Sequence, residues 1–185
     1  MNLTRPVFYF FLVLCFFGFS GCGYNFRADG EPVGIEIKSL AIPMIESSSS
    51  EKGFEAAFTT VLRNEFISHA HVPLRNKDHA GMILKVEVYK VSTQPLTYDT
   101  TQRTVSERVV THETTSSRRL ILHLDASLID SSTGKAVWND SSMTEEASYA
   151  VTADPLVNRK NEKDALLKIA GLLSRRIYNR TMERF

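Results

Sequence analysis

Cys22 is the residue whose type and position in the chain indicate a chemical reaction. Its thiol is a nucleophile that can be alkylated, and it directly follows two small residues, Ser20 and Gly21. An apolar run from Val7 to Phe19 precedes them, with the positive charge of Arg5 before it. A basic start, a short apolar stretch and small residues at a cleavage point are the layout of a secretory signal. The run is shorter than the roughly 20 residues needed to cross a bilayer, so we expect an export signal.

The junction around Cys22 resembles a bacterial lipobox, in which the sulfur receives a diacylglycerol and the chain is then cleaved just ahead of it. Several acyl chains on one residue make a stable membrane anchor. Residue 23 is Gly instead of Asp, which by resemblance to bacterial lipoproteins favours sorting to the outer membrane. The alternative is an ordinary signal peptide with a chance cysteine. We therefore predict a signal peptide over 1–21, lipidation at Cys22 and an acylated tether over 22–33.

The composition of the mature chain limits the classes of function. Removing residues 1–21 leaves 164 residues, enough for a single domain with a hydrophobic core, predicted over 34–185. The removed segment holds one basic residue and no acidic one, so 21 basic residues balance 21 acidic ones. This neutrality argues against nucleic-acid binding. Cys15 leaves with the signal and Cys22 carries the lipid, so no thiol remains for a disulfide, a metal site or catalysis.

The other candidates for chemistry do not form a complete site. His69 and His71 could ligate a metal, but no paired cysteines or carboxylate cluster complete a shell, and surface positions at a helix end explain them better. His123 and Asp125 share a predicted strand face without a serine placed to make a triad. The carboxylates of Glu145–Glu146 should point to opposite faces of a strand. No nucleotide-binding or hydrolase motif occurs. We therefore expect no enzyme activity, no metal and no cofactor.

Basic residues around one predicted hairpin are the clearest candidate for binding. Arg118 and Arg119 open a predicted strand, and Lys135 lies at the turn that follows it. Arg103 and Arg108 lie in the preceding hairpin arm. Arginine binds phosphate through a bidentate fork, so these side chains are candidate phosphate contacts. The alternative is a solvated hairpin whose charges protect its edges.

The spacing of apolar residues predicts the elements that position these side chains. Apolar residues alternate over the predicted strands, which are 34–45, 82–89, 120–128 and 136–151. They recur every three or four residues over the predicted helices, which are 54–66 and 161–182. A bulge is expected near 139–142, where the parity slips. The stretch 92–119 is expected to form the arms of a hairpin, with a mobile tip between Asp99 and Ser117.

These elements predict an α+β fold, a two-layer sandwich in which two helices pack on one face of a four-stranded, mostly antiparallel sheet. The order along the chain is β-α-β-β-β-α. The opposite face of the sheet should be polar, and either wet or covered by a partner. Its side chains are Lys85, Glu87, Tyr89, His123, Asp125 and Ser127.

Four motifs follow one another along the mature chain. They are C-G-Y-N-F-R from Cys22, L-A-I-P from Leu40, L-R-N-E-F from Leu62 and L-I-D-S-S-T-G-K-A-V-W from Leu128. With the C-terminal amphipathic helix, their order and spacing resemble the lipopolysaccharide-assembly lipoprotein family LptE (RlpB). The resemblance covers essentially the whole mature chain. The connection over 99–117 looks longer than is usual in the family.

This resemblance implies an outer-membrane lipoprotein that forms a two-protein translocon with a large β-barrel, LptD. Such a protein faces the periplasm or lies as a plug in the barrel lumen, assists barrel assembly and binds lipopolysaccharide during its insertion into the outer leaflet. Arg118 and Arg119 are then the candidate lipopolysaccharide contacts, with Arg103 and Arg108 as further candidates. The alternative is a lipid-anchored structural adaptor of another cell-envelope complex, with no glycolipid binding. A small envelope hydrolase is a third option, for which the sequence offers no nucleophile.

Overall fold

The computed structural model describes residues 36–105 and 108–182, with side chains for all of these except 101–105, 108–110 and 112. The predicted signal peptide over 1–21, the lipidation site at Cys22 and the tether over 22–33 lie outside the described residues. The predicted domain, 34–185, extends slightly beyond them at both ends.

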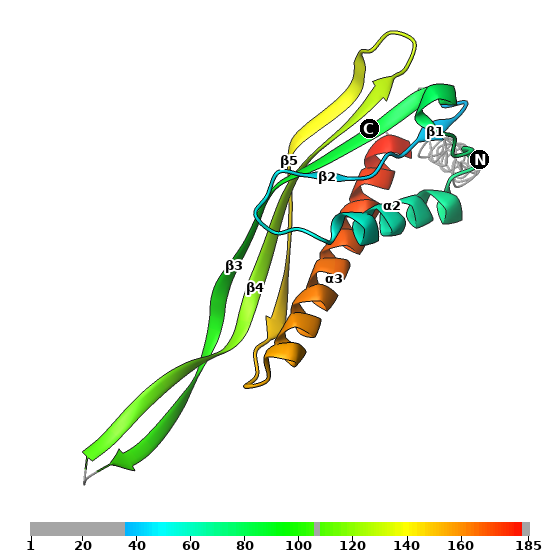
Figure 1. The fold of residues 1–185 in the computed structure, drawn as a ribbon. Helices are drawn as coiled ribbons and strands as arrows, with labels where there is room; N and C mark the ends of the chain where they lie inside the picture. The colour runs from blue at the N-terminus through cyan, green and yellow to red at the C-terminus, as the bar shows by residue number, and fades with distance from the viewer. Residues whose placement is uncertain (1–35, 106–107, 183–185) are drawn as a thin grey trace, which may run out of the picture.

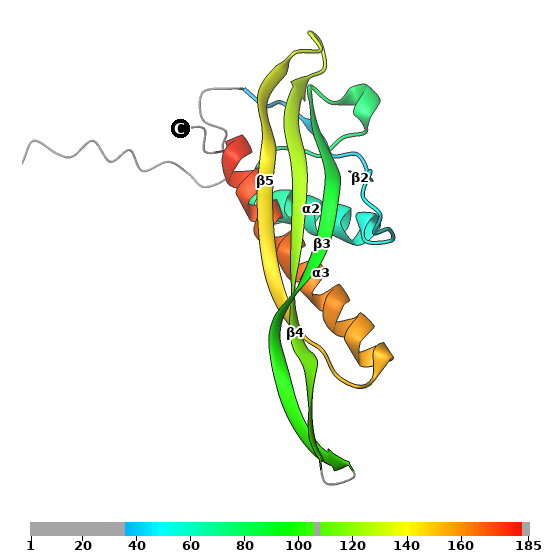
Figure 2. The same cartoon turned by 90° about the vertical axis from the view of Figure 1, so that its left-hand side faces the viewer.

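Two long helices and a five-stranded sheet make up the described chain (Figure 1). In chain order the elements are β1 (Leu40–Ala41), β2 (Glu46–Ser47), α2 (Glu55–His69), the 3-10 turn η1 (Lys77–His79), β3 (Met82–Val105), β4 (Arg108–Asp130), β5 (Ala136–Ala150) and α3 (Pro155–Met182). Figure 2 shows both helices on one side of the sheet. The predicted α+β class with two helices is confirmed.

The sheet is mixed, which corrects the prediction of a mostly antiparallel, four-stranded sheet. β1 and β2 pair with β3 in parallel, in the registers Leu40↔Met82 and Glu46↔Glu87. By contrast, β3, β4 and β5 pair in an antiparallel sense. The parallel pairing arises because α2 separates β2 from β3, and a helical crossover returns the chain in its original direction.

Only the two residues of β1 are a strand within the predicted range 34–45, and the second short strand, β2, begins directly after it. Pro43 lies between them and has no N–H to donate to a ladder. The N–H of Ile45 donates a hydrogen bond to the hydroxyl of Thr59, at 2.9 Å, instead of to a neighbouring strand. Ile42 and Ile45 are nevertheless buried. The apolar pattern therefore predicted which side chains are buried but not where the pairing breaks.

The core lies between the helices and the face of the sheet that they cover, which we call the inner face. Alternate residues of β3 from Met82 to Val88, and of β4 from Leu120 to Leu128, point into it. The helices contribute side chains that are at most 1% exposed: Phe58, Leu62, Phe66, Ile169, Leu173 and Ile177. The helices also contact each other through Phe66 and Tyr178, whose rings meet edge to face with centroids 5.3 Å apart.

The predicted bulge in β5 is present. Leu124 pairs with Met143 and Ala126 pairs with Asp140. An advance of two residues along β4 therefore corresponds to three residues along β5. The extra residue of β5 lies within the predicted stretch 139–142.

Helix α3 begins at Pro155, earlier than the predicted start at 161. The carboxylate of Asp154 accepts a hydrogen bond from the N–H of Leu156 at 2.8 Å, so Asp154 caps the helix. Proline suits the first helical position because the missing N–H would have no partner there. The cap at Asp154 therefore lets α3 begin before the first residues of its apolar stripe.

β3 and β4 continue past the end of β5 as a two-stranded ribbon (Figures 1 and 2). The last β4–β5 pair is Ser117↔Ala150, whereas the β3–β4 ladder runs on to Val105↔Arg108. We call the stretch beyond β5, residues 96–105 and 108–116, the arm; about 3.3 Å per residue makes it roughly 30 Å long. The predicted hairpin tip between Asp99 and Ser117 was therefore placed too broadly, because the threonines and valines of this stretch favour extended pairing.

Candidate functional site

Arg118 and Arg119 lie on opposite faces of the sheet. Side chains of successive strand residues alternate between faces. Arg119 is on the face away from the helices, which we call the outer face, where its Nη1 lies 3.4 Å from Glu146 Oε1. Arg118 is on the inner face, beside Tyr149, whose pKa it lowers. Arg118 and Arg119 therefore cannot bind the same phosphate group.

Arg103 and Arg108 lie in the arm, away from the other two arginines. Pro95 pairs with Arg118, and Arg103 is eight residues further along β3, a distance of roughly 26 Å for an extended chain. Arg108 lies still further out, opposite Val105. The side chains of both arm arginines lie outside the described ones. The four predicted contacts are thus spread along the molecule.

Arg118 belongs to a polar cluster where the arm leaves the sheet. The phenol of Tyr149 donates a hydrogen bond to Glu162 Oε1 at 3.4 Å, and Arg118 and Thr93 lie close enough to influence it. Burial raises the pKa of Tyr149, and the charge of Glu162 raises this pKa further, while Arg118 and Thr93 act in the opposite direction. The cluster joins all three antiparallel strands to α3.

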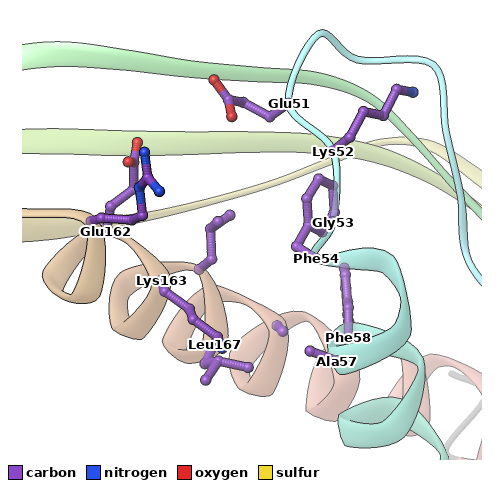
Figure 3. A pocket seen from close by; sticks show the side chains of 12 residues that line it. Glu51, Lys52, Gly53, Phe54, Ala57, Phe58, Glu162, Lys163 and Leu167 are labelled. Atoms are coloured by element: carbon purple, nitrogen blue, oxygen red, sulfur yellow. The ribbon is translucent and has the colours of Figure 1, made fainter. Parts of the chain in front are cut away.

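A hollow of about 240 Å³, which we call the inter-helix hollow, lies between α3 and the start of α2 (Figure 3). Its apolar lining consists of Phe54, Ala57, Phe58, Leu166, Leu167 and Ala170. Its charged lining consists of Glu51, Lys52, Arg159, Glu162 and Lys163. Because Glu162 also contacts Tyr149, the hollow and the polar cluster of Arg118 are adjacent.

Two cations at the hollow have no direct polar partner among the described residues. Lys52 donates a hydrogen bond to the carbonyl of Ser47, but Arg159 and Lys163 make no hydrogen bond or ion pair with any part of the chain that the structure describes. An anionic group would meet these two cations, and an alkyl chain would meet the apolar lining. Three cations against the two carboxylates Glu51 and Glu162 leave the lining with one net positive charge beside its apolar part, a combination that suits a small anionic amphiphile. No local sequence pattern identifies it, because its sides come from opposite ends of the described chain.

The outer face is polar, as predicted, and many of its side chains pair with one another. Lys85 Nζ lies 3.9 Å from Glu87 Oε2. His123 Nδ1 lies 2.9 Å from the hydroxyl of Thr144. The rings of Tyr89 and His123 lie 5.8 Å apart between centroids. This face has the chemistry of a solvated or protein-covered surface.

His69 and His71, the candidate metal ligands, lie at the end of α2 and just beyond it. Over 36–105 and 108–182, no three His, Cys, Asp or Glu side chains gather as a metal site. His69 Nδ1 lies 3.0 Å from the carbonyl of Glu65, and His71 is exposed at the helix end. None of the described helices is long and apolar enough to cross a membrane.

Comparison with known proteins finds only distant similarity. No family model and no curated protein matches the sequence. The minor lipoprotein of Acinetobacter baumannii is 15% identical over 80% of this chain and 93% of that one, with a TM-score of 0.45. The uncharacterized lipoprotein B of Nitrosomonas europaea is 13% identical over 84% and 88%, with a TM-score of 0.44. A hypothetical protein of Chlamydia trachomatis is 8% identical over 78% and 97%, with a TM-score of 0.45. At these values the similarity carries no inference about function.

Proposed function

We propose that this chain is a lipid-anchored outer-membrane component of a lipopolysaccharide translocon. In this role it plugs a large β-barrel of the LptD kind, assists the assembly of the barrel and binds lipopolysaccharide for insertion into the outer leaflet. The anchor is the acylated Cys22, and the protein acts by binding rather than by catalysis. The order of its four sequence motifs supports this proposal.

The inter-helix hollow is the structural observation that carries the proposal. Lipopolysaccharide combines alkyl chains with anionic phosphates, and the hollow combines an apolar lining with a small excess of positive charge, to which the unpaired Arg159 and Lys163 contribute. Arg118 adds a guanidinium beside the hollow, through Tyr149 and Glu162. Arginine forks bind phosphate in a bidentate manner, so the inner face at the arm base is the preferred contact region.

The test is a mild-detergent pull-down of the acylated protein from its own membranes, with mass spectrometry of the bound proteins and lipids. We expect a stoichiometric large outer-membrane barrel together with lipopolysaccharide. Recovery of the intact, anchored protein without a barrel and without lipopolysaccharide would contradict the proposal.

The second candidate is a lipid-anchored structural adaptor of another envelope complex. The outer face favours it, because many of its polar side chains pair with one another, as Lys85 does with Glu87 and Arg119 with Glu146, which suits a protein-covered surface. The same pull-down separates the two functions. An adaptor of this kind would bring down a different protein complex and no glycolipid.

A further inference from the structure

We propose that the open edge of β4 in the arm is completed by an extended strand of the partner protein, continuing the line of β5. This inference rests on the proposed function, in which the partner is the large barrel. It concerns the eight residues 108–115, whose backbone the structure describes.

This stretch of β4 has a neighbour on one side only. It pairs with β3 out to Arg108, while β5 pairs with β4 only as far as Ser117. Among the described strands none lies along its other side. Alternate residues of an extended strand direct their N–H and C=O groups to alternate sides. About half of the backbone groups of 108–115 therefore face an open edge.

The chain's own β5 cannot cover this edge, because it is led away from it. The N–H of Val151 makes the last contact, with the carbonyl of Ser116 at 2.8 Å. The N–H of Thr152 then donates to Asn158 Oδ1 at 2.7 Å, and the capped α3 begins three residues later. The hydrogen-bonded turn after Val151 therefore directs the chain away from the edge of β4.

Two other edges of the sheet each carry one feature that disfavours strand addition locally. The carbonyl of Ala150 on β5 accepts a hydrogen bond from Asn161 Nδ2 at 2.9 Å. β3 carries Pro95 at the arm base, which lacks an N–H. Residues 108–115 (R-V-V-T-H-E-T-T) contain neither Pro nor Gly, and five of the eight are β-branched. Such residues favour strand pairing. The facing stretch 96–105 of β3 also lacks both residues, so what favours the β4 edge is that it continues the existing β4–β5 pairing.

The chemistry of the edge identifies its occupant. Only an extended backbone offers donors and acceptors that alternate at the spacing of a strand. A two-stranded ribbon is marginally stable in water, and a third strand adds to its stability. The eight open residues span roughly 26 Å, which is enough for an ordinary strand of five or six residues. A strand running in the direction of β5 would extend the existing β4–β5 interface.

Residue-resolved amide hydrogen exchange tests the proposal, with the free full-length chain compared with its purified complex with the barrel. In the free chain, every second amide of 108–115 should exchange fast, while those between them are protected by β3. In the complex, the fast set should slow by at least about tenfold. This alternating signature separates strand addition from general contact.

The outcomes are distinct. A complex that contains the barrel but leaves the fast amides unchanged overturns the inference and leaves the proposed function standing. Absence of any barrel overturns the proposed function, and this inference with it. Slowing in the free chain that rises with its own concentration identifies a second copy as the occupant, which also overturns the inference.

A variant with a shortened arm provides a second test, because it leaves the hydrophobic core unchanged. Asp99 and Thr114 pair across the ladder, so an Asn-Gly turn in place of residues 100–113 should preserve the register. The variant should unfold at the temperature of the unaltered chain and recover at least about tenfold less barrel, because most of the proposed strand contact is gone. Recovery equal to that of the unaltered chain would overturn the inference.

Discussion

The backbone N–H of Ile45 donates a hydrogen bond to the hydroxyl of Thr59, at 2.9 Å in the interior of the protein. The same hydroxyl donates to the carbonyl of Glu55, one turn earlier in α2, at 2.7 Å. Thr59 is only 4% exposed. It therefore fixes the segment between β1 and β2 against α2 and replaces the ladder bond that is missing beside Pro43.

Replacing this hydroxyl should destabilise the fold. Thr59→Val keeps the shape of the side chain but leaves the N–H of Ile45 buried and unpaired, so we expect a loss of about 1–3 kcal/mol in the free energy of unfolding. Urea denaturation of the purified chain measures it. Thr59→Ser keeps the acceptor and should lose less, about 1 kcal/mol for its methyl group. Equal losses in the two variants would show that the hydrogen bond is not responsible.

Leu172 and Leu173 offer a matched comparison of exposed and buried positions on α3. Leu173 is 0% exposed and Leu172 is 38% exposed. Leu173→Ala should leave a cavity and cost about 2–5 kcal/mol, whereas Leu172→Ala should cost less than about 1 kcal/mol. Thermal unfolding followed by circular dichroism distinguishes them. Similar losses would mean that α3 does not present Leu173 to the core.

Tyr149 should make stability depend on alkaline pH. Burial and the charge of Glu162 hold its pKa above the usual value near 10, so the folded chain keeps the phenolic proton where the unfolded chain has begun to lose it. The contribution to stability is complete below the unfolded pKa and is lost as the pH rises through the folded pKa. Unfolding free energies of Tyr149→Phe should fall less steeply above about pH 10. Parallel curves for the two proteins would refute this.

Lys163 and Lys168 test the inter-helix hollow with the same substitution on the same helix. Both are exposed, but only Lys163 lines the hollow. Lys163→Glu should weaken lipopolysaccharide binding about tenfold, the loss expected for one charged contact. Lys168→Glu should bind like the unaltered protein. Calorimetric titration with purified lipopolysaccharide measures both, and equal affinities would remove the hollow from the binding site.

Arg118 and Arg119 test which face of the sheet meets the ligand. Arg118→Gln should weaken lipopolysaccharide binding about tenfold through loss of a phosphate fork on the inner face. Arg119→Gln should have a smaller effect, since Arg119 faces Glu146 on the outer face. The same titration applies. A larger loss of affinity in Arg119→Gln than in Arg118→Gln would show that the glycolipid contacts the outer face.

Local periodicity predicted what depends on local geometry. Alternation identified the buried residues of β4 from Leu120 to Leu128, and the slip of parity located the bulge near 139–142. The same alternation that separates Glu145 from Glu146 also separates Arg118 from Arg119, so the division of the arginines between two faces was accessible from sequence.

Features that depend on distant segments were not accessible in this way. The parallel pairing of Leu40 with Met82 joins residues that no local pattern connects. The inter-helix hollow exists only because α2 and α3 meet in the folded chain. Its unpaired Lys163 belongs, by sequence pattern alone, to an ordinary solvated helix face.

The position of α3 after the strands of the sheet has a consequence for folding during export. Short connections join β3, β4 and β5, so these strands can pair early. β1 and β2 can pair only once β3 is available. In a chain delivered N-terminus first, Ile169, Leu173 and Ile177 arrive last. Until then only α2 is present to cover the inner face, and the apolar part over which α3 packs is exposed and prone to aggregate. The interval between the emergence of β4 and that of α3 is therefore when a chaperone would protect this chain most.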